Sequence, residues 1–123
     1  ILKVDEELGG KGPRHDGLQI VERVLPDAVD DTSQWLEWWP YPQKRRDSHS
    51  ILGNAVLLAR RKAKKRQQQD FQQKKKSYFL NDQPTSPFAI TTRACKKRRW
   101  GPKELAEAQR INVSALYKAW DLR

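Results

Sequence analysis

Residues 50–80 read SILGNAVLLARRKAKKRQQQDFQQKKKSYFL, and this stretch decides the expected fold. Its first part places apolar residues at the spacing of one helix face: Ile51, Leu52, Ala55, Val56, Leu58 and Ala59. Its second part, from Arg60 to Lys76, holds nine Lys or Arg and no Gly or Pro, which favours a helix that cannot bury a face. We therefore expect one helix from a Ser50 cap to about Lys76, roughly 40 Å long at 1.5 Å per residue.

The charge of the second half is almost purely positive, which distinguishes it from an ordinary solvated helix face. Residues 60–76 contain a single acid, Asp70, among their cations. A rod of one sign attracts phosphate groups, whereas a solvated surface helix usually carries both signs. We interpret this half as a polyanion contact that projects from an apolar anchor.

Charge is unevenly divided along the 123 residues, whose formal net charge is +10. Residues 1–40 hold four Lys or Arg against nine acids, a net charge of −5, whereas residues 41–123 hold 21 against six, a net charge of +15. With 33% charged residues, little apolar material is left for a core. The expected fold class is mainly α: one long basic helix plus shorter helices, with extended coil termini and no large independent core.

Composition divides the chain into four segments. They are an acidic, Trp-rich N-terminal docking segment (1–43), the long basic helix (44–80), a Pro-containing linker and basic segment (81–100) and a C-terminal helical segment (101–123). Residues 1–16 have no clear period, which is typical of coil. Residues 17–25, GLQIVERVL, end at Pro26 and predict a short helix or strand.

A short tryptophan-rich helix is expected before the basic body. Asp31 and Gln34 have the form of a capping box, and Pro40 ends the helix. Acidic neighbours of this helix would repel phosphates, so its aromatic groups are interpreted as core or protein-docking residues, with stacking on unpaired bases as the alternative. The docking residues are Trp35, Trp38, Trp39 and Tyr41.

After the basic helix, residues 81–87 (NDQPTSP) predict a turn, and residues 88–92 (FAITT) predict a short extended piece. Residues 96–100, KKRRW, are typical of segments that grip a nucleic-acid backbone. Pro102 then favours the start of a C-terminal helix.

Leu105–Trp120, LAEAQRINVSALYKAW, resembles a helix-turn-helix core. A small residue, Ala106, lies where that motif keeps one, and Ile111 and Val113 flank the expected turn. Arg110 departs from the motif, because its position usually carries Gly. One helix, bent or broken near Asn112, explains the same residues and is the favoured interpretation.

No catalytic set is visible, and the chain is interpreted as a non-enzyme without cofactor or metal. A lone cysteine, Cys95, and two histidines exclude an internal disulfide and a zinc set. Nearby cations could lower the pKa of the Cys95 thiol. His49 is interpreted as a cap or surface residue. No apolar run approaches the roughly 18 residues of a membrane span.

In overall character, rather than by a specific motif, the chain resembles the accessory proteins of mitochondrial ribosomes. The absence of Met agrees with a cleaved import presequence and a place in the mitochondrial matrix. The resemblance implies a structural role, with ribosomal RNA and neighbouring ribosomal proteins as partners. The implied nucleic-acid contacts are Lys44, Arg45, Arg46, Arg60, Arg61, Lys62, Lys64, Lys65, Arg66, Lys74, Lys75, Lys76, Lys96, Lys97, Arg98, Arg99 and Trp100.

Two other interpretations stay open. RRKAKKR and KKRR also have the form of nuclear import signals, which would suit a nuclear DNA-binding or chromatin-associated protein that reads DNA with its C-terminal helices. A helical subunit of an organellar membrane complex is the third, although the basic half lacks the apolar stripe that such a role requires.

Overall fold

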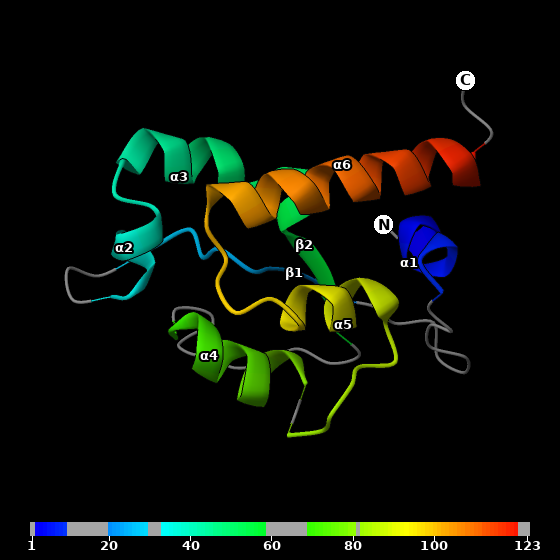
Figure 1. Cartoon of the computed structure of the whole chain (residues 1–123), viewed down its shortest axis with the longest axis horizontal. Helices are drawn as coiled ribbons and strands as arrows, with labels where there is room; N and C mark the ends of the chain where they lie inside the picture. The colour runs from blue at the N-terminus through cyan, green and yellow to red at the C-terminus, as the bar shows by residue number, and fades with distance from the viewer. Residues whose placement is uncertain (1, 10–19, 30–32, 59–68, 81, 121–123) are drawn as a thin grey trace.

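The computed structural model describes residues 2–9, 20–29, 33–58, 69–80 and 82–120, and these parts are mainly helical, which confirms the predicted class. Figure 1 shows the helices arranged around two short strands. In chain order the elements are α1 (Leu2–Glu7), β1 (Ile20–Arg23), α2 (Trp35–Trp38), α3 (Pro42–His49), the 3-10 turn η1 (Leu52–Asn54), β2 (Ala55–Leu58), α4 (Phe71–Gln73), the π-helical η3 (Lys74–Phe79), α5 (Ala89–Cys95) and α6 (Pro102–Ala119).

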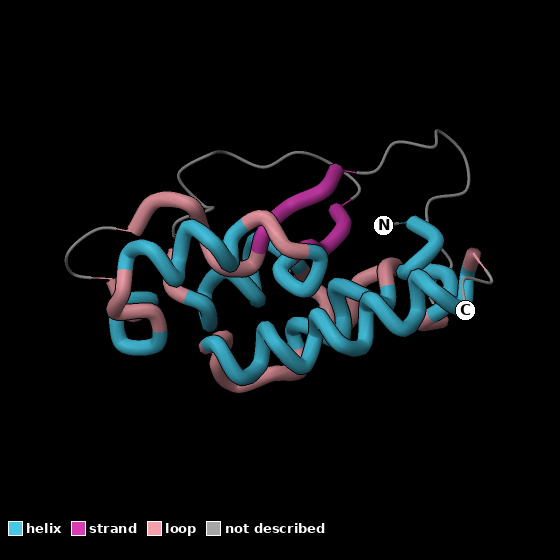
Figure 2. The backbone as a smooth tube through the Cα atoms, turned by 90° about the horizontal axis from the view of Figure 1, so that it is seen from above, coloured by secondary structure: helices cyan, strands magenta, loops and turns pink. Residues whose placement is uncertain are grey.

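Strands β1 and β2 form an antiparallel pair, seen side by side in Figure 2, with Arg23 opposite Ala55. The single helix predicted from Ser50 to Lys76 is wrong, because Ser50 ends α3 and β2 follows η1. All four residues of β2 are buried. A short apolar run fits a buried strand as well as a helix face, and pairing with β1 decides between them. Residues 59–68 of the predicted helix lie outside the described residues.

Aromatic rings make the centre of the core. Trp35, Trp39 and Trp100 are at most 1% exposed, and Phe71 lies between Trp35 and Trp100, with ring centroids 5.8 and 6.0 Å away. The Trp35 indole donates a hydrogen bond to the Gln69 carbonyl at 2.8 Å, and the Trp39 indole donates to the Trp100 carbonyl at 2.7 Å. These rings are therefore interior groups with satisfied N–H donors.

The C-terminal helix α6 is unbroken over 18 residues and runs along one side of the molecule (Figure 1). Its first turn is closed by the Gly101 backbone N–H, which donates to the Glu104 carboxylate at 2.9 Å. The favoured single helix is confirmed, without the bend or break expected near Asn112, and the helix-turn-helix alternative is wrong because the residues of its turn are helical. The Asn112 side chain is buried. In the described parts of the chain, no helix is long and apolar enough to cross a membrane.

Close packing of α6 on η1 depends on Gly53. A Cβ atom at this position would lie 2.5 Å from the Gln109 backbone nitrogen, so any larger residue would push the two elements apart. The Gly53 N–H also donates to the Gln109 side-chain carbonyl. The absence of a side chain therefore allows the close approach of η1 and α6.

Two predictions for the flanking segments are also wrong. In residues 88–92, expected to be extended, only Phe88 is extended and Ala89 begins α5, and residues 2–7, expected to be coil, form α1. The physical reason is a contact between them: a buried Asp5 carboxylate oxygen accepts a hydrogen bond from the Ile90 N–H at 2.8 Å. This satisfies an N–H at the start of α5, where no intrahelical acceptor exists. Burial raises the pKa of Asp5, and this hydrogen bond opposes the rise.

The side-chain amide of Asn54 holds the fold together at its centre and is fully buried. Its oxygen accepts hydrogen bonds from the Leu25 N–H at 2.7 Å and the Trp100 indole at 3.1 Å. Its nitrogen donates to the carbonyl oxygens of Leu25 at 3.0 Å and His49 at 2.9 Å. One amide thus joins the segment after β1, the end of α3 and the loop before α6.

Replacing Asn54 with Ala should lower the free energy of unfolding by about 3 kcal/mol or more, because several buried partners each lose a hydrogen bond at about 1–3 kcal/mol. Urea denaturation followed by tryptophan fluorescence measures the change. Gln43→Ala, which removes an exposed amide on α3, is the matched control and should cost less than about 0.5 kcal/mol. Equal stability of the two variants would contradict the central role of Asn54.

Candidate functional site

A polar pocket lies where the end of β1 meets the end of α3 and the start of η3. Its volume is about 220 Å³, and its polar groups are Glu22, Arg23, Asp27, His49 and Lys74. They come from separate parts of the sequence, and the pairing of β1 with β2 and the Asn54 hydrogen bonds bring these parts together. Carboxylates, cations and an imidazole therefore face a single cavity.

Lys74 forms the floor of this pocket and is 1% exposed. Its Nζ donates hydrogen bonds to the carbonyl oxygens of Arg23 and Val24, both at 2.9 Å. Burial lowers the pKa of Lys74 to about 7, and the carboxylates of Glu22 and Asp27 oppose the fall. A neutral amine keeps two N–H donors, which matches the two carbonyl oxygens, so the contact survives deprotonation.

His49 lies at the other side of the pocket and is half-buried. Burial lowers the pKa of its imidazole, Asp27 opposes the fall, and Arg23 and Lys74 add to it. Its backbone carbonyl is held by Asn54, so the position of the residue is fixed from the core. The ring is therefore mainly neutral near pH 7 and able to accept a proton.

The cations predicted to bind nucleic acid on α3 differ in their contacts. Lys44 and Arg46 are exposed, and Arg46 donates to the Gln43 side chain at 2.9 Å. Arg45 is half-buried and donates to the Trp39 carbonyl at 2.6 Å. Lys44 and Arg46 are therefore the α3 cations that a partner can reach.

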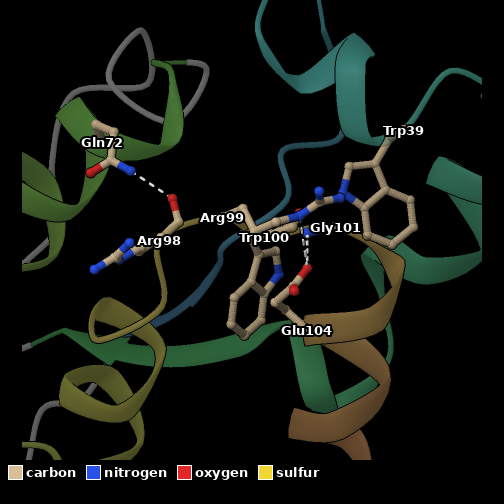
Figure 3. A network of polar contacts seen from close by, with 7 residues as sticks. All are labelled: Trp39, Gln72, Arg98, Arg99, Trp100, Gly101 and Glu104. Atoms are coloured by element: carbon tan, nitrogen blue, oxygen red, sulfur yellow. Dashed lines mark hydrogen bonds and ion pairs between the residues drawn. The ribbon is translucent and has the colours of Figure 1, made fainter.

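A second group of predicted cations lies where α4 and η3 meet the loop before α6. Gln72 donates to the Arg98 carbonyl at 2.6 Å, as Figure 3 shows, and Lys75 donates to the Lys97 carbonyl at 2.6 Å. The two segments thus lie side by side. Their exposed cations that form no ion pair within the described parts of the chain, which we call the basic edge, are Lys76, Lys96 and Arg98.

Other predicted contacts serve the fold. Arg99 pairs with Glu104 at 3.2 Å and lies 5.7 Å from the Trp38 ring centroid. Trp100 is 1% exposed, and Lys74 reaches only the pocket floor, so neither side chain can lie against a nucleic acid at the surface as predicted. The predicted cations Arg60, Arg61, Lys62, Lys64, Lys65 and Arg66 lie outside the described residues.

The aromatic docking group divides between core and surface. Trp35 and Trp39 are buried, Trp38 is half-buried, and Tyr41 is 72% exposed. Protein docking through Tyr41 and the open edge of Trp38 stays a prediction.

The pKa of the Cys95 thiol is raised, whereas the sequence predicts that nearby cations lower it. Burial raises the pKa of the thiol to about 12, and Lys75, the cation that opposes this rise, does not compensate for it. A thiol of this kind is a poor nucleophile. Among the described residues, no group of three or more His, Cys, Asp or Glu side chains could hold a metal ion.

Sequence reasoning missed most of the polar pocket. The sequence predicts no functional role for Glu22, Arg23 and Asp27, and it favours a cap or surface role for His49. The available signal was the group of charged residues on both sides of Pro26. Nothing in the spacing connects this group to His49 or Lys74, because only the folded chain brings them together.

Protein stability should rise with pH between about 7 and 10.5, the folded pKa of Lys74 and its ordinary value. In this range the unfolded chain binds a proton at Lys74 that the folded chain has lost, so folding is favoured on deprotonation by on the order of 1 kcal/mol per pH unit. Urea denaturation at several pH values should show this slope in the wild type but not in Lys74→Met. The exposed-site control Lys76→Met should follow the wild type, and parallel curves for all three proteins would contradict the lowered pKa.

A family model described as the C-terminal domain of GmrSD restriction endonucleases matches residues 3–111. No curated protein and no solved structure matches the chain significantly. The match includes both strands, the polar pocket and the start of α6.

This match overturns the ribosomal interpretation, which rested on overall character alone. The predicted partners, ribosomal RNA and ribosomal proteins, are wrong. The predicted mitochondrial and nuclear locations are contradicted as well. The prediction of a non-enzyme is also contradicted, because the family consists of C-terminal domains of restriction endonucleases. Since the match spans most of its 123 residues, the chain belongs to the family of GmrSD restriction endonuclease C-terminal domains.

Proposed function

We propose that this chain contacts DNA and hydrolyses its phosphodiester bonds in the polar pocket. The observation that carries the proposal is the convergence of His49, Asp27 and Arg23 on one cavity. An imidazole, a carboxylate and a guanidinium are the groups that acid–base chemistry on a phosphate requires. Membership of a restriction endonuclease family supports DNA as the substrate.

His49 is the proposed general base. Because burial lowers the pKa of the imidazole, the ring is available to take a proton from a water molecule near pH 7. The Asp27 carboxylate favours the protonated ring and would stabilise the imidazolium that this transfer forms. The water oxygen then attacks phosphorus and one P–O bond to a sugar breaks. The leaving oxygen takes up a proton from solvent, and the His49 imidazolium returns its proton to solvent.

Arg23 is the proposed phosphate ligand. It is half-buried at the end of β1 and lines the same cavity as His49. A guanidinium presents several N–H donors and stays charged, so it suits the phosphate oxygens in the ground state and in the transition state. Lys74 fixes this end of β1 through the Arg23 carbonyl and acts as a positioning residue.

Changing His49 to Ala should lower the rate of DNA cleavage by about 10²–10⁴-fold, the usual contribution of a general base. The purified protein is assayed on labelled duplex DNA, and affinity for the same duplex is measured alongside. Binding should stay within about threefold, because the imidazole makes no predicted contact to the bound backbone.

Gln43→Ala, on the exposed side of α3, is the matched control and should cleave at the wild-type rate. Undiminished cleavage by His49→Ala would remove the imidazole from the mechanism. If the wild-type protein binds duplex DNA without cutting it, the hydrolytic part of the proposal is overturned and only the DNA-binding part is kept.

The basic edge is proposed to contact the DNA backbone. Each neutralised phosphate contributes about 0.9 to the slope of log affinity against log salt on duplex DNA. Changing Lys76 and Arg98 together to Gln should therefore flatten the slope by about 2 and weaken binding to all sequences alike. Fluorescence anisotropy at several salt concentrations measures the slope. Lys3→Gln and Lys118→Gln, exposed cations on α1 and α6, form the control pair; an equal change in that pair would mean that binding has no preferred surface.

A further inference from the structure

A second cavity, separate from the polar pocket, lies between α5 and α6. Its volume is about 290 Å³, near the lower end of the roughly 300–1,000 Å³ that is typical of small-ligand sites. Small side chains create the space: Ala94 on α5 and Ala108 on α6 face it, and Ala55 of β2 lines it from below. Larger walls come from the Trp100 indole and Ile111.

The interior of this cavity suits a mainly apolar body with a polar edge. Asn112 contributes a buried amide, 4% exposed, whose nitrogen lies 3.4 Å from the Leu52 carbonyl oxygen. That distance is at the long limit for a hydrogen bond, so little is lost if the amide turns to a better partner. Asn side chains form paired hydrogen bonds with the edge of a nucleobase.

The rim of the cavity is cationic. Lys97 is neutralised by Glu107 at 2.7 Å, which leaves Arg93 and Lys96. Both are exposed, and in the described parts of the chain neither forms an ion pair. Two separate cations beside an apolar cavity match a nucleoside that carries a phosphate on each side, as every nucleoside within a strand does.

We propose that this cavity accepts one nucleobase extruded from a DNA strand, with Arg93 and Lys96 holding the flanking phosphates. The inference rests on the proposed function only for DNA as the source of the base. Extrusion costs unstacking and unpairing energy, which is smallest for a mismatched base. Binding should therefore favour a duplex that contains one central mismatch.

The test compares affinities for a fully paired duplex and for the same duplex with one central mismatch. The wild-type protein should prefer the mismatch by about tenfold or more, because extruding a mismatched base avoids the cost of breaking a base pair. Ala108→Leu fills the cavity and keeps a strong helix former, so the preference should fall to about onefold. Ala106→Leu adds the same bulk to the exposed face of α6 and should keep the wild-type preference.

Arg93→Gln is the second variant, because an exposed side chain can be changed without disturbing the core. It should lower the mismatch preference at least threefold. A 2-aminopurine placed at the mismatch should gain fluorescence with the wild type and with Ala106→Leu, but not with Ala108→Leu. Thermal unfolding verifies that each variant is folded.

Equal mismatch preference in the wild type and Ala108→Leu overturns the inference and leaves DNA binding by the basic edge intact. A second outcome is that the wild type binds free deoxynucleoside monophosphate tightly, that Ala108→Leu abolishes this binding, and that 2-aminopurine in duplex DNA gains no fluorescence. This outcome overturns extrusion and assigns the cavity to a free nucleotide. A wild type that binds no DNA overturns this inference together with the proposed function.

Discussion

The buried amide of Asn54 is the constraint on which the other contacts depend. It uses its oxygen and its nitrogen on Leu25, His49 and Trp100, so the segment after β1, the end of α3 and the loop before α6 cannot move independently. The Trp100 carbonyl in turn accepts from Trp39, which extends the network to the loop after α2. A polar group at 0% exposure is tolerated only when it is fully hydrogen-bonded, and full bonding also makes its geometry specific.

Lys74 is a second buried polar group with satisfied hydrogen bonds, and it lies at the edge of the core, where it lines the polar pocket. Its stem lies among aromatic rings, with Nζ 5.5 Å from the Phe79 centroid and 5.7 Å from the Tyr78 centroid, while its nitrogen holds two carbonyl groups at the end of β1. Asn54 fixes the His49 side of the polar pocket and Lys74 fixes the Arg23 side. The pocket is therefore rigid because two buried polar groups that support it are both satisfied, and a rigid site holds reacting groups in place without further ordering.

Local signals in the sequence predict the parts of this fold that depend on neighbouring residues. Pro102 and Glu104 define the start of α6, and the tryptophan spacing before Pro40 predicts a short helix where α2 lies. Contacts between distant residues decide the rest. Ala55–Leu58 could be helix or strand until β1 pairs with it, and α5 begins at a helix start that Asp5 caps from 85 positions away. The cations of KKRRW differ in their contacts. Lys97 and Arg99 have carboxylate partners on α6, whereas Lys96 and Arg98 are exposed and form no ion pair with the described residues.

The same distinction explains why charge alone cannot say which polyanion a basic chain would meet, and why the expected ribosomal RNA is contradicted by the family match. Phosphate contacts are sequence-tolerant and nearly the same for RNA and DNA, so a net charge of +15 over residues 41–123 cannot separate a ribosomal protein from a C-terminal domain of the restriction endonuclease family. What distinguishes the two classes of protein is where the folded chain places its acids, its buried lysine and its histidine. Two of the acids from the acidic first 40 residues, Glu22 and Asp27, lie beside Lys74 and His49 and change the pKa values that acid–base chemistry needs. In the folded chain these two carboxylates line the pocket in which hydrolysis is proposed.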